Sequence, residues 1–256
     1  MLTVEGIVLK ERFSGEQDKF IDVLTKESGV LEVLVKGARK INGKSGSSAQ
    51  LFAYSRFCLD YRKNGFSLNS SEPLHIFYGL RDSLSKISLA SYFADILRFC
   101  IGSEKQNENI MRLLLNSLYY LENNQRSEQL LKTVFEFRLM SEIGYMPDIV
   151  ACRKCGCYEP LQLFFSVSDG GFFCSECFEK TNSDNFIKTE LPVLSAVRHI
   201  VLADFNRLFN FRVSDTAMQV LSALSESYAL THLERNFPTL DFYKGITVNN
   251  LKNMNP

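Results

Sequence analysis

The chain has 256 residues and a formal net charge of zero; 45% of its residues are hydrophobic and 23% are charged. These values are ordinary for a folded globular protein, and they exclude a wholly disordered chain or one that coats nucleic acid through its overall charge. The length favours two or three domains. No apolar run approaches the roughly 18 residues that cross a bilayer, and the N-terminus lacks the features of a signal peptide, so we expect a cytoplasmic protein without membrane attachment.

The first 79 residues favour short β-strands that form a small barrel or sandwich. Expected strands cover roughly 3–13, 20–24, 30–35, 52–61 and 74–78, and the apolar residues of the fourth have a period close to two. Asn64-Gly65 predicts a hairpin, and residues 26–29 are typical of a turn.

The stretch GARKINGKS at residues 37–45 is similar to a phosphate-binding loop, but its spacing is wrong. Five residues separate the two glycines, whereas a nucleotide loop needs four, and residues 46–48 disfavour an immediate helix. Nucleotide hydrolysis is therefore not expected, and Asn42-Gly43 favours a flexible hairpin loop. Residues 36–44 still place four positive charges within nine residues, with no acid before Asp60: Lys36, Arg39, Lys40 and Lys44.

Apolar residues recur at helical spacing from Leu80 onward. Expected helices cover roughly 84–99, 110–121, 127–144, 191–205 and 216–234. Ser127 is the expected N-cap of the third helix and Gly144 its C′ residue. That helix is apolar on nearly all sides, which predicts a central position in a bundle. Residues 148–185, rich in Cys and Gly, interrupt the helical part, so its two halves are expected to pack together.

Four of the seven cysteines form two CxxC pairs separated by 18 residues: Cys152, Cys155, Cys174 and Cys177. This spacing is typical of a four-cysteine zinc site. Gly156 tolerates the positive φ that such turns often need, and Gly170-Gly171 supplies a return hairpin. Four protein ligands leave no coordination position open, so the zinc is expected to be structural.

Other roles for these cysteines and their neighbours stay open. A redox CxxC would need a thioredoxin-like βαβ context, which the sequence lacks. Cys157 could replace Cys155 as a ligand, although it breaks the two-residue gap. Arg153 and Lys154 could contact DNA, but a purely stabilising role is favoured, since a closed site needs no further function. Cys58 and Cys100 are expected to be core thiols.

No sequence motif indicates catalysis. The three histidines, His75, His199 and His232, are scattered, and GxSxG, HExxH and GxGxxG are all absent. We therefore expect a protein that is not an enzyme.

Several stretches closely resemble the RecO family of bacterial DNA-repair proteins. They are GEQDKFIDVLTKESGVLEVLVKGARK at 15–40, FEFRLMSEIGYMPDIVACRKCG at 135–156, FSVSDGGFFCSEC at 165–177 and HLERNFPTLDFY at 232–243. The resemblance covers essentially the whole chain. It implies a recombination mediator that binds single- and double-stranded DNA, anneals complementary strands, engages the single-strand-binding protein (SSB) and RecR, and helps RecA replace SSB. It also implies association with the nucleoid.

The resemblance implies an α+β multidomain fold in three parts. An N-terminal OB-fold β-barrel occupies residues 1–79. An all-α helical bundle occupies 80–147 and 182–256, and a four-cysteine zinc module is inserted at 148–181.

An OB-fold follows a nucleic-acid backbone with a basic groove that bears aromatic side chains, without reading sequence. The expected DNA contacts are Lys36, Arg39, Lys40 and Lys44, with Lys10 and Arg12 as lesser candidates. Charges that merely solvate a loop are the alternative explanation. Phe52, Tyr54 and Phe57 could stack on bases, although their alternation favours the core.

The SSB tail of this family is acidic and hydrophobic, so it requires a cation beside an apolar groove. Lys132 and Arg138 on the central helix are the candidates, and Arg138 could equally be an ordinary helix-surface charge. A function of a different class is a zinc-stapled interaction scaffold whose barrel binds another protein and never touches DNA.

Overall fold

The computed structural model describes residues 1–38, 46–63, 65–102, 107–160, 162–180 and 185–254, the side chains of 249–254 excepted. The chain separates into two compact units, Met1–Asn123 with Phe237–Pro256, and Asn124–Asn236. Three parts were expected from the sequence, a barrel, a helical bundle and an inserted zinc module. The division into two units does not test the boundaries of those three parts, which stay a prediction.

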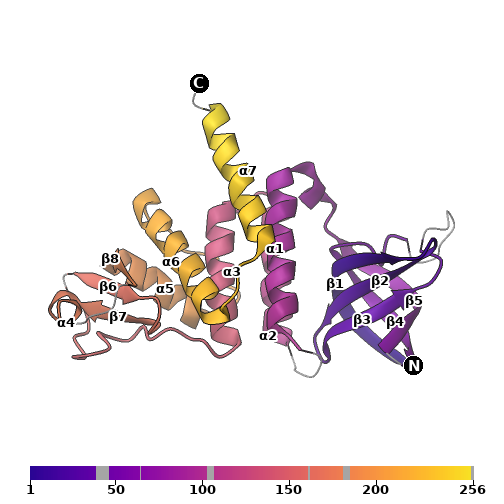
Figure 1. The fold of residues 1–256 in the computed structure, drawn as a ribbon, viewed down its shortest axis with the longest axis horizontal. Coiled ribbons are helices and arrows are strands. Elements are labelled where there is room, and N and C mark those ends of the chain that lie inside the picture. Colours follow the sequence, from indigo (N-terminus) through magenta and orange to yellow (C-terminus); the bar gives the residue numbers. More distant parts are fainter. Residues whose placement is uncertain (39–45, 64, 103–106, 161, 181–184, 255–256) are drawn as a thin grey trace. The chain divides into compact units, whose positions relative to one another are not determined.

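Five strands close into a barrel in the first unit (Figure 1). They are β1 (Leu2–Ser14), β2 (Asp18–Thr25), β3 (Gly29–Val35), β4 (Ala53–Arg62) and β5 (Gly65–Ile76). The order around the barrel is β1-β2-β3-β5-β4, and β1 pairs with β4 to complete it. Only β3 and β5 run parallel. The expected OB-like barrel is confirmed, with a last strand that begins at residue 65 and not at 74.

The barrel interior is filled by alternating residues, as the strand pattern predicts. Phe57 and Leu59 of β4 are fully buried, and so is Phe52 just before that strand. Burial excludes Phe52 and Phe57 from base stacking. Gly6 lets β1 and β2 approach closely, because a Cβ atom there would lie 2.5 Å from the Val23 side chain.

Helices complete the first unit: η1 (Tyr78–Asp82), α1 (Leu84–Cys100), α2 (Glu108–Glu122) and α7 (Pro238–Met254). α7 was not expected from the sequence. Phe237, just before it, is buried, with its ring centroid 5.9 Å from that of Tyr92 on α1. Arg98 of α1 donates a hydrogen bond to Asp22 of β2 at 2.7 Å and so joins this helix to the barrel.

The second unit is built on α3 (Glu128–Glu142), α5 (Leu191–Leu202) and α6 (Asp215–Leu233), and α3 packs against the other two. Ten residues of α3 are buried, which confirms its predicted central position. Its expected ends are also confirmed. The Ser127 hydroxyl accepts a hydrogen bond from the Leu130 amide at 3.3 Å, and Gly144 has a φ of +100°.

Replacing Ser127 with alanine is expected to lower the free energy of unfolding of the second unit by about 1 kcal/mol, because an amide at the start of α3 loses its acceptor. Urea or thermal denaturation followed by circular dichroism measures this loss. Ser195→Ala, at an exposed position inside α5, is the matched control and should leave stability unchanged. Equal stability of the wild type and Ser127→Ala would contradict the capping role.

A small sheet carries the cysteines of the second unit. Its strands are β6 (Leu163–Ser166), β7 (Gly171–Cys174) and β8 (Phe186–Thr189), in the order β7-β6-β8, and the short helix α4 (Ser175–Phe178) follows β7. The expected return hairpin is confirmed, with Gly170 at a φ of +66°. β8 was not predicted, and it extends this sheet beyond residue 181. Among the described helices of the chain, none is long and apolar enough to span a membrane.

Candidate nucleic-acid interface and metal site

Both ends of the basic loop are anchored to the barrel. On leaving β3, the Gly37 amide donates a hydrogen bond to Asp18 at 2.8 Å, and Ala38 packs against the barrel core. Gly37 has a φ of +62°, which favours glycine at this sharp exit. On the return, Ser48 is buried and its carbonyl accepts a hydrogen bond from the Ser55 hydroxyl of β4. The loop therefore leaves and rejoins the barrel at fixed points.

The predicted DNA contacts have different surroundings. Lys36 is exposed directly after β3, and Lys10 is exposed on β1. Within the described residues neither makes an ion pair. Arg39, Lys40 and Lys44 lie outside the described residues, so their part in a DNA site stays a prediction.

Arg12 is already paired within the barrel. Its guanidinium contacts Asp22 at 2.8 Å and Glu32 at 2.5 Å. The hydrogen bond to Glu32 holds the pKa of Arg12 above its ordinary value. Since two carboxylates neutralise this cation, it has less charge to offer a phosphate than Lys36 or Lys10 has.

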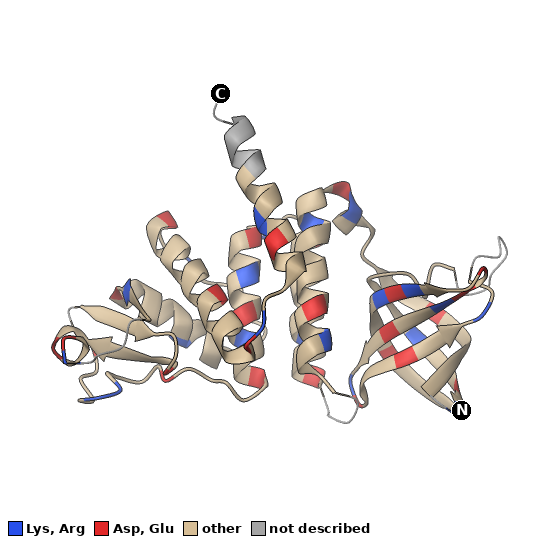
Figure 2. Ribbon diagram, in the orientation of Figure 1, with Lys and Arg blue, Asp and Glu red and all other residues tan. Residues whose placement is uncertain are grey.

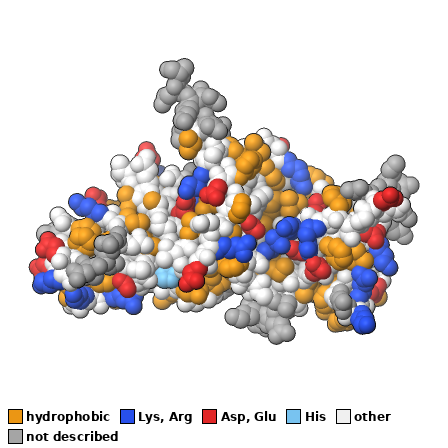
Figure 3. Space-filling model, in the orientation of Figure 1, with side chains coloured by type: hydrophobic (Ala, Val, Ile, Leu, Met, Phe, Trp, Pro, Cys, Tyr) orange, Lys and Arg blue, Asp and Glu red, His pale blue; other side chains and the backbone are white. Residues whose placement is uncertain are grey.

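Further barrel cations are also paired with acids. Lys19 is buried against Glu11 at 2.8 Å, and Arg56 lies 3.0 Å from Glu5. Figure 2 shows this interleaving of Lys and Arg with Asp and Glu on the strands, and Figure 3 shows mixed charges on the barrel face that it draws. The surface of the described strands thus carries little uniform positive charge, so any polyanion site there must be local.

Two further exposed cations of the described barrel residues, not named from the sequence, make no ion pair there. Arg62 ends β4 and Lys63 follows it in the β4–β5 turn. Both are exposed, and in the described part of the chain neither makes an ion pair. The hairpin signal at residues 64–65 marked this turn, but only the structure shows which neighbouring charges are unpaired.

The four cysteines of the CxxC pairs converge. The sulfur atoms of Cys152, Cys155, Cys174 and Cys177 all lie within 4.8 Å of one another. The first pair sits on a turn closed by a hydrogen bond from the Gly156 amide to the Cys152 carbonyl, with Gly156 at a φ of +74°. The second pair spans the end of β7 and α4. Four thiolates in this arrangement suit a tetrahedral metal ion such as zinc.

The sulfur atoms differ in proton affinity. Burial raises the pKa of Cys177 to about 12 and also raises that of Cys174. Burial has the same effect on Cys152, but hydrogen bonds from the backbone amides of Cys155, Cys174 and Lys154 outweigh it and lower the pKa of Cys152 to about 6. Four thiolates this close repel one another, so a bound cation would replace protons as the stabilising charge.

The residues beside this cluster differ in exposure and in their contacts. Cys157 is exposed and does not belong to the four-sulfur group found among the described residues. Its carbonyl instead accepts a hydrogen bond from the Cys152 amide. The Arg153 guanidinium donates to the Asp169 carbonyl, which ties the first cysteine turn to the β6–β7 hairpin. Lys154 is exposed.

Lys132, a predicted partner contact, is buried inside the second unit. Its ammonium group lies 3.0 Å from Glu136 and 2.8 Å from Glu226, and Glu136 also accepts a hydrogen bond from Ser225. Burial alone would lower the pKa of Lys132, but the two carboxylates outweigh it and raise the pKa. With 3% of its surface exposed, Lys132 cannot reach the tail of a partner in this conformation.

Arg138, the other predicted partner contact, stabilises the end of a helix. Its guanidinium donates to the carbonyls of Val201 and Ala203, at the C-terminal end of α5, and lies 4.6 Å from the ring centroid of Phe205. Glu142 accepts a further hydrogen bond at 2.8 Å. Cations commonly satisfy the last carbonyls of a helix in this way. The side chain is therefore engaged within the unit.

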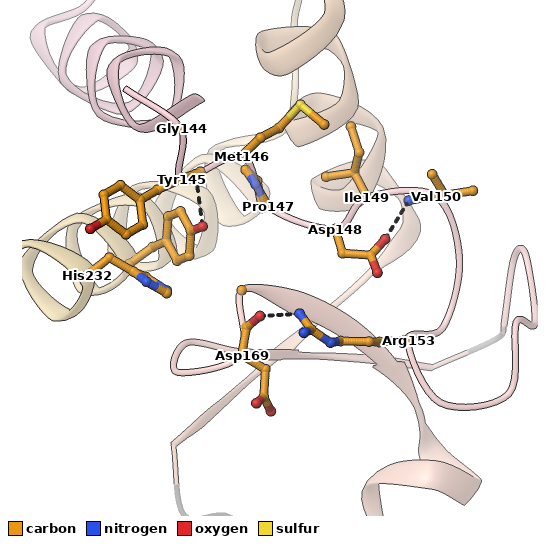
Figure 4. A pocket seen from close by; sticks show the side chains of 12 residues that line it. Gly144, Tyr145, Met146, Pro147, Asp148, Ile149, Val150, Arg153, Asp169 and His232 are labelled. Carbon is orange, nitrogen blue, oxygen red and sulfur yellow. Dashed lines mark hydrogen bonds between the residues drawn. The ribbon is translucent and has the colours of Figure 1, made fainter. Parts of the chain in front are cut away.

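A cavity of about 420 Å³ lies where the segment after α3 passes the β6–β7 hairpin and α6 (Figure 4). The polar side chains that line this cavity form hydrogen bonds mainly with backbone carbonyls. Tyr228 donates to the Tyr145 carbonyl at 3.0 Å, and a ring nitrogen of His232 lies 3.0 Å from the Val167 carbonyl. Burial raises the pKa of Tyr228 to about 12. These contacts hold the chain between α3 and the cysteines against α6.

Comparisons with known proteins agree along the whole chain. Residues 1–77 match the family described as Recombination protein O N terminal, and residues 81–241 match Recombination protein O C terminal. The DNA repair protein RecO of Acetivibrio thermocellus is 35% identical, over 95% of this chain and 96% of the relative. That of Caldicellulosiruptor saccharolyticus is 29% identical, over 96% and 98%. With its closed five-stranded barrel, its helices and its four-cysteine cluster, the chain belongs to the RecO family of DNA repair proteins.

Proposed function

We propose that this protein is a non-catalytic recombination mediator. It binds single- and double-stranded DNA, anneals complementary strands, engages SSB-coated single strands and RecR, and thereby assists RecA loading in recombinational repair. It acts in the cytoplasm, associated with the nucleoid. The observation that carries the proposal is the loop with four cations, which leaves the closed barrel at the exposed Lys36 and returns to it at Ser48.

Electrostatics supports a binding role for this loop. A cation on a loop whose two ends are fixed loses less conformational freedom on binding than one on a free tail, because its distance from the barrel is already limited. Four contacts to the phosphates of a single strand would release counterions and give a salt slope near roughly −3. Affinity would then fall about 50-fold between 50 and 200 mM salt. Such binding is independent of sequence, which suits annealing.

The metal has a supporting role in this proposal. Cys152, Cys155, Cys174 and Cys177 would hold a structural zinc ion that fixes the small sheet on the second unit. Zinc would supply no chemistry to DNA, since four thiolates close its coordination sphere. The burial of Lys132 and the internal contacts of Arg138 give no support to an SSB contact through these two side chains.

A labelled oligonucleotide separates this function from the scaffold alternative. At low salt, the fluorescence anisotropy of a single strand is expected to rise as the protein is added, and the affinity is expected to fall steeply as salt increases. A scaffold whose barrel binds only proteins would leave the anisotropy unchanged. The paired cations Arg12, Lys19 and Arg56 are the observation that favours this alternative, since they reduce the free positive charge of the barrel. No rise in anisotropy at low salt would exclude DNA binding.

A further inference from the structure

An aromatic side chain is exposed at the end of the inward-facing row of β4. Phe57 and Leu59 of this row are fully buried, but Tyr61, the next residue of the row, is 66% exposed. Since alternate residues of a strand point to the same side, Tyr61 continues the core face past the point where the barrel covers it. An exposed large aromatic ring at this position contributes little to the core and is available for a ligand.

The ring of Tyr61 packs on one side against the ring of Phe66. Phe66 pairs with Tyr61 across the β4–β5 hairpin, and the two ring centroids lie 5.4 Å apart at 46°. Phe66 in turn packs against the barrel core. Cross-strand aromatic pairs of this kind restrict both rings. The contact with Phe66 therefore restricts rotation of the Tyr61 ring, and we call this ring the platform.

Positive charges adjoin this platform. Arg62 and Lys63 follow Tyr61 directly, both are exposed, and within the described residues neither makes an ion pair. The nearest acid in sequence, Asp60, accepts a hydrogen bond from Asn69 at 2.9 Å. An aromatic ring beside unpaired cations suits a polyanion that also carries flat apolar groups, which describes a nucleic acid whose bases are unstacked.

The platform and the basic loop belong to neighbouring strands. Phe66 of β5 pairs with Tyr61 on one side and with Val33 of β3 on the other, and β4, β5 and β3 are adjacent in the barrel (Figure 1). With adjacent strands about 4.8 Å apart, the backbone at Tyr61 lies about 10 Å from that at Val33. Lys36 follows Val33 by three residues. One bound strand covers such a span, since an OB-fold occupies roughly 4–16 nucleotides.

The geometry points to a base-stacking site at the β4–β5 hairpin, where Tyr61 stacks on an unpaired base while Arg62 and Lys63 contact the flanking phosphates. This inference rests on the proposed DNA-binding function and adds to it a preference for single strands. Bases in a duplex stack on their neighbours and are not available to Tyr61, whereas the phosphates of both forms reach the cations. The loop then provides affinity for both forms of DNA, and the hairpin distinguishes single strands from duplexes.

The chain contains no tryptophan, so Tyr61→Trp places a single tryptophan, excited selectively over the tyrosines, at the proposed platform. Its fluorescence is expected to be quenched by an oligothymidine single strand and to change little with a duplex of equal length, because only the unpaired bases can stack on it. Tyr119→Trp is the matched control. Tyr119 is 48% exposed on α2, away from the hairpin in sequence, and its emission should stay constant.

Affinity measurements complete the test. Tyr61→Ala is expected to weaken single-strand binding by about five-fold or more and duplex binding by less than about two-fold, while Tyr61→Phe retains wild-type affinity. The joint change of Arg62 and Lys63 to Ala should make the single-strand salt slope shallower by about 1.4. Anisotropy that shows DNA binding by Tyr61→Trp with unchanged emission, or equal single-strand affinities for Tyr61→Ala and wild type, would overturn this inference alone. A wild type that binds no oligonucleotide would overturn the proposed function together with it.

Discussion

Serine in place of Cys174 is expected to abolish the proposed zinc binding and to unfold the small sheet of the second unit. A structural zinc ion contributes roughly 10–16 kcal/mol of binding energy in sites of this kind. The apolar support at the cluster is small, with Phe173 and Phe186 packed beside the sulfurs. Without the metal these contacts are too few to hold four thiols together. Zinc per chain, measured by dye release, and thermal unfolding curves follow the two losses.

The exposed Cys157 provides a matched control in the same turn. Cys157→Ser is expected to keep its zinc and its melting temperature, since this sulfur does not belong to the cluster. Cys155→Ser should behave like Cys174→Ser, although Cys155 is exposed. Loss of zinc from Cys157→Ser, with retention by Cys155→Ser, would show that the two sulfurs exchange roles and would contradict this ligand set.

The features predicted correctly from sequence depend on short-range signals. Ser127 and Gly144 mark the ends of α3 because capping involves residues only three or four apart. The two CxxC pairs predict a cluster because each turn places its own two sulfurs, and a single hairpin brings the pairs together. The strands of the barrel follow similarly from alternation and hairpin turns. Their pattern fitted a barrel or a sandwich, and only the family resemblance implied the OB-fold. In each case the chain near the feature contains most of the information.

The missed elements depend on tertiary context. No helix was expected after residue 234, yet proline is favoured at the first position of a helix, and α7 begins at Pro238. Its stability depends on burial of Phe237 against Tyr92, a residue more than 140 positions earlier. β8 is four residues long, too short for a clear pattern, and it exists because it pairs with β6.

The sequence identified charged and aromatic residues as candidates for the site, but it did not show which of them are exposed. A sequence shows that Lys132 and Arg12 are cations, but not that carboxylates on other elements pair with them, Glu226 of α6 with Lys132 and Asp22 of β2 with Arg12. In the same way, the period of β4 assigns Tyr61 to the core face, and only the end of the barrel leaves it exposed. Which charges are free to bind a polyanion is therefore a property of the fold.

Removal of all four loop cations together is expected to have the largest effect on DNA. In the variant Lys36→Ala, Arg39→Ala, Lys40→Ala and Lys44→Ala, single-strand affinity at 50 mM salt should fall by up to a factor on the order of a thousand. Each lost phosphate contact removes one counterion release, so the salt slope should become shallower by roughly 3. Annealing of complementary strands should slow in parallel. Anisotropy titrations over a range of salt and a fluorescence annealing assay measure both effects.

A control variant with the same net charge as the loop variant distinguishes local contacts at the loop from the electrostatic attraction of the whole protein. Four exposed cations of the second unit, replaced together by alanine, lower the net charge by the same amount: Lys180, Lys188, Arg207 and Arg212. If the loop acts through local phosphate contacts, this control keeps the wild-type salt slope, because charges that make no phosphate contact release no counterions, and screening at about 8 Å in 0.15 M salt weakens their long-range attraction. If both variants lose affinity equally, the attraction is general and the loop has no special place in the mechanism. If the loop variant retains the annealing rate and the salt slope of the wild type, the barrel binds DNA through other residues or does not bind DNA. The anisotropy of the labelled strand distinguishes those two cases.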